Sequence, residues 1–186
     1  MSKVAIILIP LVIIGVLVVG AFGIYNGLVS SQEEAKAAWA KVENQYQRRA
    51  DLIPNLVETV KGYAQQERDV LEEVTRLRSQ WGEARQSGDI NKTLQAVQGL
   101  EGGLGRLMVV VEKYPDLKSN QNFMKLQDQL EGTENRISVE RKRFNESVLS
   151  YNKKIRTFPG VLFAGLFGFE GMPLFEAEQD AKKAPL

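Results

Sequence analysis

The first pattern along the chain is an uninterrupted apolar run close to its N-terminus. Residues 4–24 carry no charged side chain, and 17 of these 21 residues are aliphatic, alanine or phenylalanine. A helix of this length, rising about 1.5 Å per residue, spans roughly 31 Å and matches a bilayer core about 30 Å thick. We therefore predict a transmembrane anchor over residues 4–24, after a short tail at residues 1–3. Residues assigned to the membrane span include Val4, Ile7, Leu11, Ile14, Leu17, Phe22 and Ile24.

A cleaved signal peptide is the alternative interpretation of this run, because Val19-Gly20-Ala21 resembles a cleavage site. The run is nevertheless longer than the apolar region of ordinary signal peptides, which has about 7–15 residues, and Lys3 is the one basic side chain before it. Lys36 and Lys41 follow the run, so the positive-inside rule gives nearly a tie. We expect an uncleaved single-pass anchor in the bacterial inner membrane and slightly favour a domain on the non-cytoplasmic face.

After the anchor, apolar positions recur in steps of three and four residues. Between Trp39 and Trp81 the steps alternate without a slip, which is a 3.5-residue period typical of long helices in left-handed packing. Pro54 lies inside this run, and proline in a helix interior costs about 3 kcal/mol and usually kinks the helix. We predict one helix over about residues 30–86, kinked at Pro54 but not reversed there.

Two further helices follow from the same spacing. Gln86-Ser87-Gly88-Asp89 reads as a turn, with Gly88 suited to a helix C-terminus and Asp89 to an N-cap. Apolar stripes then predict helices over about residues 90–114 and 117–157. Since no useful period-2 alternation occurs, the expected fold is all-α: an N-terminal transmembrane helix followed by an antiparallel helical bundle or coiled coil at residues 25–157.

The segment at residues 158–175 is rich in phenylalanine and glycine. It is too short to span a bilayer, and side chains of this kind rarely stay exposed in a monomer. The segment could fold onto the bundle end, lie at the membrane interface or join two protomers. Self-association is favoured if the third helix runs parallel to the first, and its residues would be Phe158, Leu162, Phe163, Leu166, Phe167, Phe169 and Phe175. Residues 176–186 are polar, and we expect them to be disordered.

Two charged residues, Arg49 and Glu67, interrupt the apolar stripe of the first predicted helix. A charge that faces a core is costly unless it is paired. Eighteen residues separate the two along one helix, roughly 27 Å, so each needs a partner from another helix. Glu134 and Arg141 of the third helix are the candidates, either as buried pairs that fix the helix register or as a functional polar site.

The composition removes several reaction classes. The chain has no histidine and no cysteine, so it lacks an imidazole base, a thiolate nucleophile and the usual ligands of zinc. The net charge of +1 argues against a dedicated nucleic-acid binder. The glycines between Gly99 and Gly105 match neither a Walker loop nor a dinucleotide fingerprint, and we attribute them to close helix approach or a local break. We expect no catalytic residue, cofactor or metal site.

Specific runs of residues make the chain resemble the LemA family. They include residues 48–57 (RRADLIPNLV), 60–64 (VKGYA), 114–118 (YPDLK) and 132–137 (GTENRI), and the likeness extends to about Phe175. The resemblance implies an N-terminally anchored bacterial envelope protein with an all-α antiparallel coiled-coil domain, in which Pro54 is a standard feature. It supplies no catalytic residue.

The function expected from these observations is that of a non-enzymatic, membrane-anchored helical scaffold that self-associates into a homo-oligomer. One alternative is an envelope signalling or stress adaptor that binds another envelope protein through its helical domain. A second is a lipid-binding or membrane-remodelling protein. The expected partners are therefore a second copy of the chain and the lipid bilayer.

Overall fold

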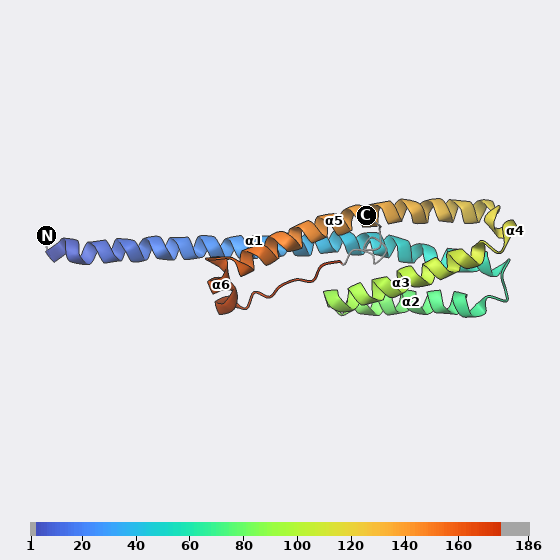
Figure 1. The fold of residues 1–186 in the computed structure, drawn as a ribbon, viewed down its shortest axis with the longest axis horizontal. Coiled ribbons are helices and arrows are strands. Elements are labelled where there is room, and N and C mark those ends of the chain that lie inside the picture. The colour runs from blue at the N-terminus through green and yellow to red at the C-terminus, as the bar shows by residue number, and fades with distance from the viewer. Residues whose placement is uncertain (1–2, 176–186) are drawn as a thin grey trace, which may run out of the picture. The chain divides into compact units, whose positions relative to one another are not determined.

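The computed structural model describes residues 3–175, and Figure 1 shows that this part of the chain is built from helices. The bounds are α1 Lys3–Lys61, α2 Arg68–Gln86, α3 Ile90–Val111, α4 Pro115–Lys118, α5 Gln121–Arg156 and α6 Gly160–Phe167. No strand occurs among residues 3–175, so the all-α prediction is confirmed. The tail predicted over residues 176–186 and the first two residues lie outside the described part, as do the side chains of Val4 and Ile7.

The helix predicted over about residues 30–86 is two helices. α1 continues through Pro54 and ends at Lys61, and the chain reverses at residues 62–67 before α2 begins. Ala64 anchors the reversal, because it is fully buried and its N–H donates to the Val60 carbonyl at 2.9 Å. The expectation of one unreversed helix was therefore wrong, for a physical reason: the reversal lets each half of the apolar stripe pack against other helices.

Contacts between α1 and α2 show that the two run antiparallel. Arg78 Nε donates to the Ala50 carbonyl at 2.9 Å, and Arg85 Nη1 donates to Gln47 Oε1 at 2.6 Å. The residue numbers of the α1 partners fall as those of the α2 partners rise, as expected for two antiparallel helices.

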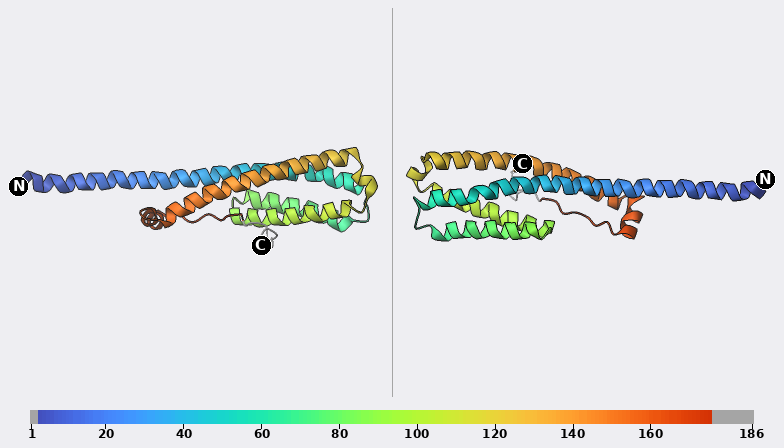
Figure 2. Two further views of the ribbon diagram at one scale, coloured as in Figure 1. Left: turned by 45° about the horizontal axis from the view of Figure 1, so that its top comes forward. Right: turned by 180° about the vertical axis from the view of Figure 1, so that it is seen from behind.

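The chain divides into two compact units, which share α1 and α5. The first unit holds residues up to Ala38 together with Arg143–Leu174, and the second holds Trp39–Lys142 with Phe175. In the second unit, α2 and α3 lie side by side in both views of Figure 2. Its core consists of apolar side chains from every helix of the unit, including Tyr46, Ile53, Leu56, Trp81, Leu100, Leu107, Leu117, Phe123 and Ile137.

The helix ends of the second unit follow local signals in the sequence. Asp89 caps α3 by accepting from the N–H groups of Asn91 and Lys92, at 2.9 and 3.2 Å. Gly88 before it has a positive φ of 68°, which glycine adopts at little cost. α3 is unbroken through its glycines, and a Cβ at Gly103 would lie 2.6 Å from a methyl of Leu77. Close approach of α2 and α3, one of the two expected explanations, therefore accounts for Gly103.

In the first unit, the C-terminal part of α5 lies beside α1 and α6 closes the end of that pair. Leu28, Tyr151, Ile155 and Ala164 form its buried cluster, with Phe163, Phe169 and Met172 packed against it. Gln32 Nε2 donates to the Tyr151 hydroxyl at 3.4 Å, and Lys154 Nζ contacts Ser31 Oγ. The residue numbers of these contacts rise along α5 as they fall along α1, so α5 runs antiparallel to α1. The C-terminal end of α5 therefore lies close to the apolar part of α1, as Figure 1 shows.

Candidate functional site

The most concentrated set of polar side chains lies inside the second unit. Tyr46 and Arg49 come from α1, Glu101 from α3, and Glu134 and Arg141 from α5. The Tyr46 hydroxyl donates to Glu101 Oε1 at 2.6 Å, and Arg141 Nη1 lies 3.4 Å from the same oxygen. Arg49 forms an ion pair with Glu134. This interior polar cluster therefore ties α1, α3 and α5 together.

Burial explains why these charges are paired. The Arg49 side chain is 13% exposed, so an unpaired guanidinium there would be costly. Arg49 Nε is buried and has no hydrogen-bond partner among the described residues, so the pairing rests on Nη1. Burial also raises the pKa of Tyr46, and the adjacent Glu101 carboxylate raises it further. The hydroxyl thus stays protonated and serves as a hydrogen-bond donor, which is a structural task.

The structure places the four predicted core charges in different ways. It brings Arg49 and Glu134 together, and it pairs Arg141 with Glu101. Glu67 pairs with neither arginine: it precedes α2 in the reversal and accepts a hydrogen bond from the Tyr114 hydroxyl at 3.2 Å. Glu101 was not among the predicted partners, although it occupies a position in the apolar stripe of α3, the same signal that singled out Arg49.

A polar cluster joins the connections at one end of the second unit. The Tyr114 hydroxyl, besides donating to Glu67, accepts from Gln66 Nε2 at 2.8 Å, and Asn120 Nδ2 donates to the Tyr63 hydroxyl at 2.9 Å. These bonds link the reversal after α1 to the connections that flank α4. Most of these hydrogen bonds are exposed to solvent. They stabilise the connections between helices at this end of the unit.

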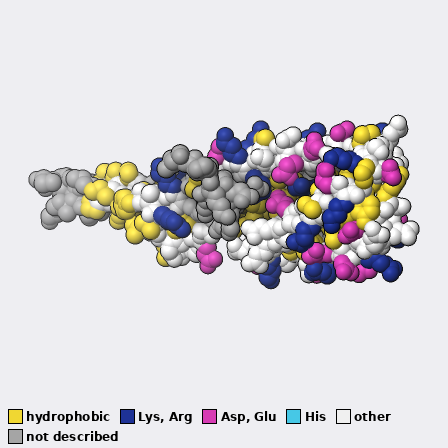
Figure 3. Space-filling model, turned by 45° about the vertical axis from the view of Figure 1, so that its right-hand side comes forward, with side chains coloured by type: hydrophobic (Ala, Val, Ile, Leu, Met, Phe, Trp, Pro, Cys, Tyr) yellow, Lys and Arg dark blue, Asp and Glu magenta, His cyan; other side chains and the backbone are white. Residues whose placement is uncertain are grey.

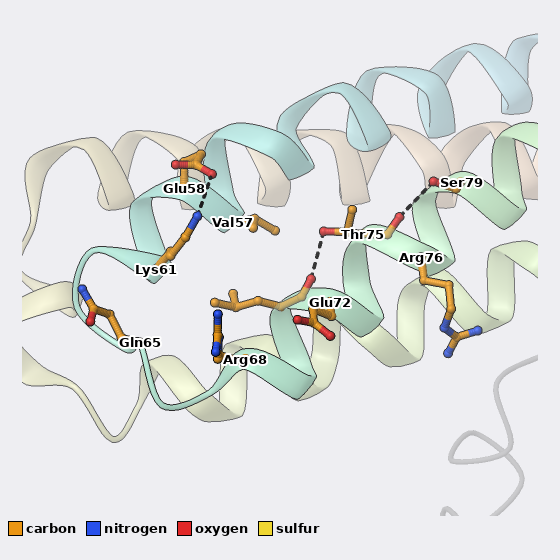
Figure 4. Close-up of a pocket in the computed structure, with 10 residues that line it drawn as sticks. Val57, Glu58, Lys61, Gln65, Arg68, Glu72, Thr75, Arg76 and Ser79 are labelled. Atoms are coloured by element: carbon orange, nitrogen blue, oxygen red, sulfur yellow. Dashed lines mark hydrogen bonds and ion pairs between the residues drawn. The ribbon is translucent and has the colours of Figure 1, made fainter.

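A groove of about 860 Å³ lies between the end of α1 and α2 (Figure 4). Figure 4 shows Lys61 reaching Glu58, a pair with 3.8 Å between Nζ and Oε1, while Arg68 and Glu72 extend from α2. Its walls carry three basic and two acidic side chains, so charge alone does not single out an anion or a cation as its occupant. Among the described residues there is also no group of three acidic side chains placed to hold a metal ion.

The apolar part of α1 forms a different kind of surface. Leu11, Ile14, Leu17 and Phe22 are all exposed, and almost none of this stretch is buried within the structure. Figure 3 shows yellow side chains gathered beside the grey N-terminal end, with basic and acidic side chains interspersed elsewhere on the same face. The helix is long and apolar enough to cross a membrane, which indicates that the protein is associated with one.

The residues predicted for self-association separate into three groups. Phe158, Leu162, Leu166 and Phe167 are exposed on and next to α6. Phe163 and Phe169 are partly buried in the first unit. Phe175 is buried in the second unit, where its ring lies 5.8 Å from that of Trp39 and 4.6 Å from the guanidinium of Arg141. Phe175 is therefore a packing residue and does not belong to the exposed apolar face.

The position of α6 differs from the arrangement that favoured self-association through this segment. That arrangement needed α5 parallel to α1, with the segment far from the anchor. α5 is antiparallel, and Tyr25 of α1 contacts the rings of Phe167 and Phe169 at centroid distances of 4.9 and 5.8 Å. The segment thus lies next to the end of the apolar run.

Comparisons with known proteins identify the family of the chain. A LemA family model matches residues 38–186. The magnetosome protein MamQ of Magnetospirillum gryphiswaldense is 29% identical over 185 residues, covering 87% of this chain and 68% of that protein. MamQ 2 of Paramagnetospirillum magneticum shows the same identity and coverage. Protein LemA of Metamycoplasma hominis is 24% identical over 171 residues, covering 88% of this chain and 76% of that protein. Because the family model covers most of the chain, this protein is a member of the LemA family.

Proposed function

We propose that this LemA family protein is a non-enzymatic helical scaffold, anchored by a single span in the bacterial inner membrane and self-associating there. The observation that carries the proposal is α1, whose apolar N-terminal part is bare while its remainder is packed with other helices. Such a helix exposes an apolar surface, which is unfavourable in water and favourable in the hydrocarbon core of a bilayer. The interior charges support a structural role, because the ion pairs hold helices together.

A face of α1 with small residues supports self-association. Gly20, Gly23 and Gly27 are spaced by three and four residues, so they lie on one side of the helix. A Cβ placed on any of the three meets no atom within 4 Å, so the structure leaves this side open. Small residues at such spacing let membrane helices approach closely, which is a common way for spans to associate.

The mass of the full-length protein in detergent tests this function. We expect light scattering to give a protein mass of two or more chains, each of 20.8 kDa. Gly23→Leu should shift the mass toward that of one chain, because a bulky side chain separates the helices. Ala21→Leu is the control: Ala21 is two residues from Gly23 and therefore lies on nearly the opposite side of the helix. A wild-type mass of one chain would refute the scaffold, and an unchanged mass in Gly23→Leu would refute this face.

A second candidate, lipid binding, is favoured by the exposed apolar side chains of α6. They lie beside Tyr25, directly after the predicted span, and not at the far end of the helices. This candidate differs from the first in what covers the apolar surface: lipid instead of protein. The two are compatible, since the anchor could associate through its glycine face while α6 touches the membrane.

A further inference from the structure

α6 is an eight-residue helix without a polar side chain, and one side of it is used for packing. Its sequence is GVLFAGLF, and Gly160 and Ala164 are buried against the first unit. A Cβ at Gly160 would lie 2.1 Å from the Lys154 carbonyl and 3.5 Å from a methyl of Leu28, so glycine permits this close docking. The position of α6 on α1 and α5 is therefore fixed by contacts.

The other side of α6 is apolar and uncovered. Leu162 is 62% exposed and Leu166 is 77% exposed, and Phe158, just before the helix, is exposed as well. A surface helix normally presents polar residues to water, and a helix that is apolar all round is normally surrounded by protein or lipid. We call Phe158, Leu162 and Leu166 the outer face of α6, whereas Phe167 lies on the docked side against Tyr25.

The level of α6 along α1 indicates what covers this face. Tyr25, which touches Phe167 and Phe169, is one residue beyond the apolar run that ends at Ile24, and Leu28 is four residues beyond it. At about 1.5 Å per residue, α6 docks within roughly 6 Å of the end of the run. The headgroup layer on each side of a bilayer core is about as thick as that. If the run spans the membrane, α6 lies at the membrane surface.

The charges around this level suit a membrane surface. The last turn of α5, which leads into α6, carries Lys153, Lys154 and Arg156, and no acidic residue. On α1, the carboxylate of Glu33 is paired with Lys36 at 2.8 Å, and Glu34 accepts a hydrogen bond from Ser30. Basic side chains next to a buried apolar face are the arrangement by which interfacial helices bind anionic lipids.

We propose that α6 is an interfacial membrane-binding helix whose outer face enters the bilayer that α1 anchors, with the basic last turn of α5 at the headgroups. The proposal rests on the membrane anchoring proposed above. In this arrangement two helices attach the protein to the membrane: α1 crosses the bilayer and α6 lies on its surface. A second copy of the chain is the competing occupant, and the docking of α6 directly after the apolar run of α1 favours lipid.

Fluorescence quenching by brominated lipids tests this placement in the full-length protein. The chain has no cysteine, so a label attaches at a single introduced one. Three labelled variants, Leu166→Cys, Phe22→Cys and Val109→Cys, would be reconstituted in vesicles of phosphatidylcholine and phosphatidylglycerol with bromine near the headgroup end of the acyl chains. Position 22 reports the anchor, and position 109 is an exposed control on α3.

We expect labels at positions 22 and 166 both to lose about half of their fluorescence relative to vesicles without bromine, since an interfacial helix buries its apolar face about 5–10 Å deep. The label at position 109 should be unaffected. Quenching at 22 but not at 166 would overturn the proposal for α6 and leave the anchor standing. Quenching at neither position would overturn both. Disulfide cross-linking between two chains of the Leu166→Cys variant, without quenching, would assign the outer face to a second copy and also overturn the proposal.

Discussion

Replacing Glu101 with leucine is expected to lower the free energy of unfolding by about 3 kcal/mol, because the change leaves two polar groups inside the second unit without their partner. The Tyr46 hydroxyl loses its acceptor at 2.6 Å, and Arg141 loses its carboxylate at 3.4 Å. Arg141 keeps its contact with the ring of Phe175, so the loss is smaller than for a wholly isolated charge. Denaturant unfolding of the full-length protein in detergent, followed by circular dichroism, measures the effect.

Glu73→Leu is the matched control for this prediction. Glu73 also pairs with an arginine on a neighbouring helix, and two of the three guanidinium nitrogens of Arg106, Nε and Nη2, lie 3.1 and 2.8 Å from its oxygens. That pair is more exposed to solvent, so its loss should cost less than about 1 kcal/mol. Equal losses in the two variants would mean that the interior polar cluster contributes no more than a surface ion pair.

The double variant Ile14→Arg with Leu17→Arg is expected to release the protein from the membrane. Both positions lie near the middle of the predicted span, where each arginine costs about 3 kcal/mol to insert, and the pair therefore costs about 6 kcal/mol. The fraction of protein that stays in the membrane pellet after alkaline extraction measures the effect. We expect wild-type protein in the pellet and the double variant mainly in the supernatant.

Val109→Arg with Leu149→Arg provides the control, because it adds the same charge at positions equally open in the structure. Ile14 is 59% exposed and Val109 is 63% exposed, so exposure alone does not distinguish the two pairs. Only contact with lipid makes the arginines costly at positions 14 and 17. If both double variants stay in the pellet, or both leave it, the span is not at residues 4–24.

The helical class and most helix ends could be predicted from the sequence because they depend on local signals. The spacing of apolar residues gave the stripes, and Asp89 with Gly88 gave the start of α3. The reversal after Lys61 was missed because Tyr63 and Glu67 continue the three-and-four spacing through it. In the structure Tyr63 is exposed, and the buried positions pass instead through Ala64 and Leu71. The three-and-four spacing of apolar residues can thus continue unchanged across a tight turn between two helices.

That missed reversal also decides between the alternative locations that the sequence left open for the segment at residues 158–175. With one long first helix, the third helix runs parallel to it and carries the phenylalanine-rich segment away from the anchor. One additional reversal changes the direction of α5 and brings α6 to Tyr25. The location of α6 depends on the number of reversals before it, so the composition of the segment alone could not reveal it.

Partners inside the core were predictable only in part. Arg49 could be nominated because it is a charge on a core-facing stripe, and the structure pairs it with Glu134, one of its two predicted candidates on the third helix. The pairing of Arg141 with Glu101 required knowing which levels of α3 and α5 coincide. Which residues of α3 and α5 lie at the same height depends on how the folded helices are positioned against each other. The spacing of residues along the sequence does not show this.

Labelling of single introduced cysteines in sealed vesicles tests the central claim, that α1 anchors the protein by crossing the membrane, most directly. The chain has no native cysteine, so a membrane-impermeant maleimide reports one chosen position at a time. Cysteines at positions 11, 14 and 17 should stay unreactive until the protein is denatured, whereas cysteine at position 36, exposed on the same helix, should react from one side of the membrane. Ready labelling at positions 11, 14 and 17 would contradict the account, because those side chains would then face water.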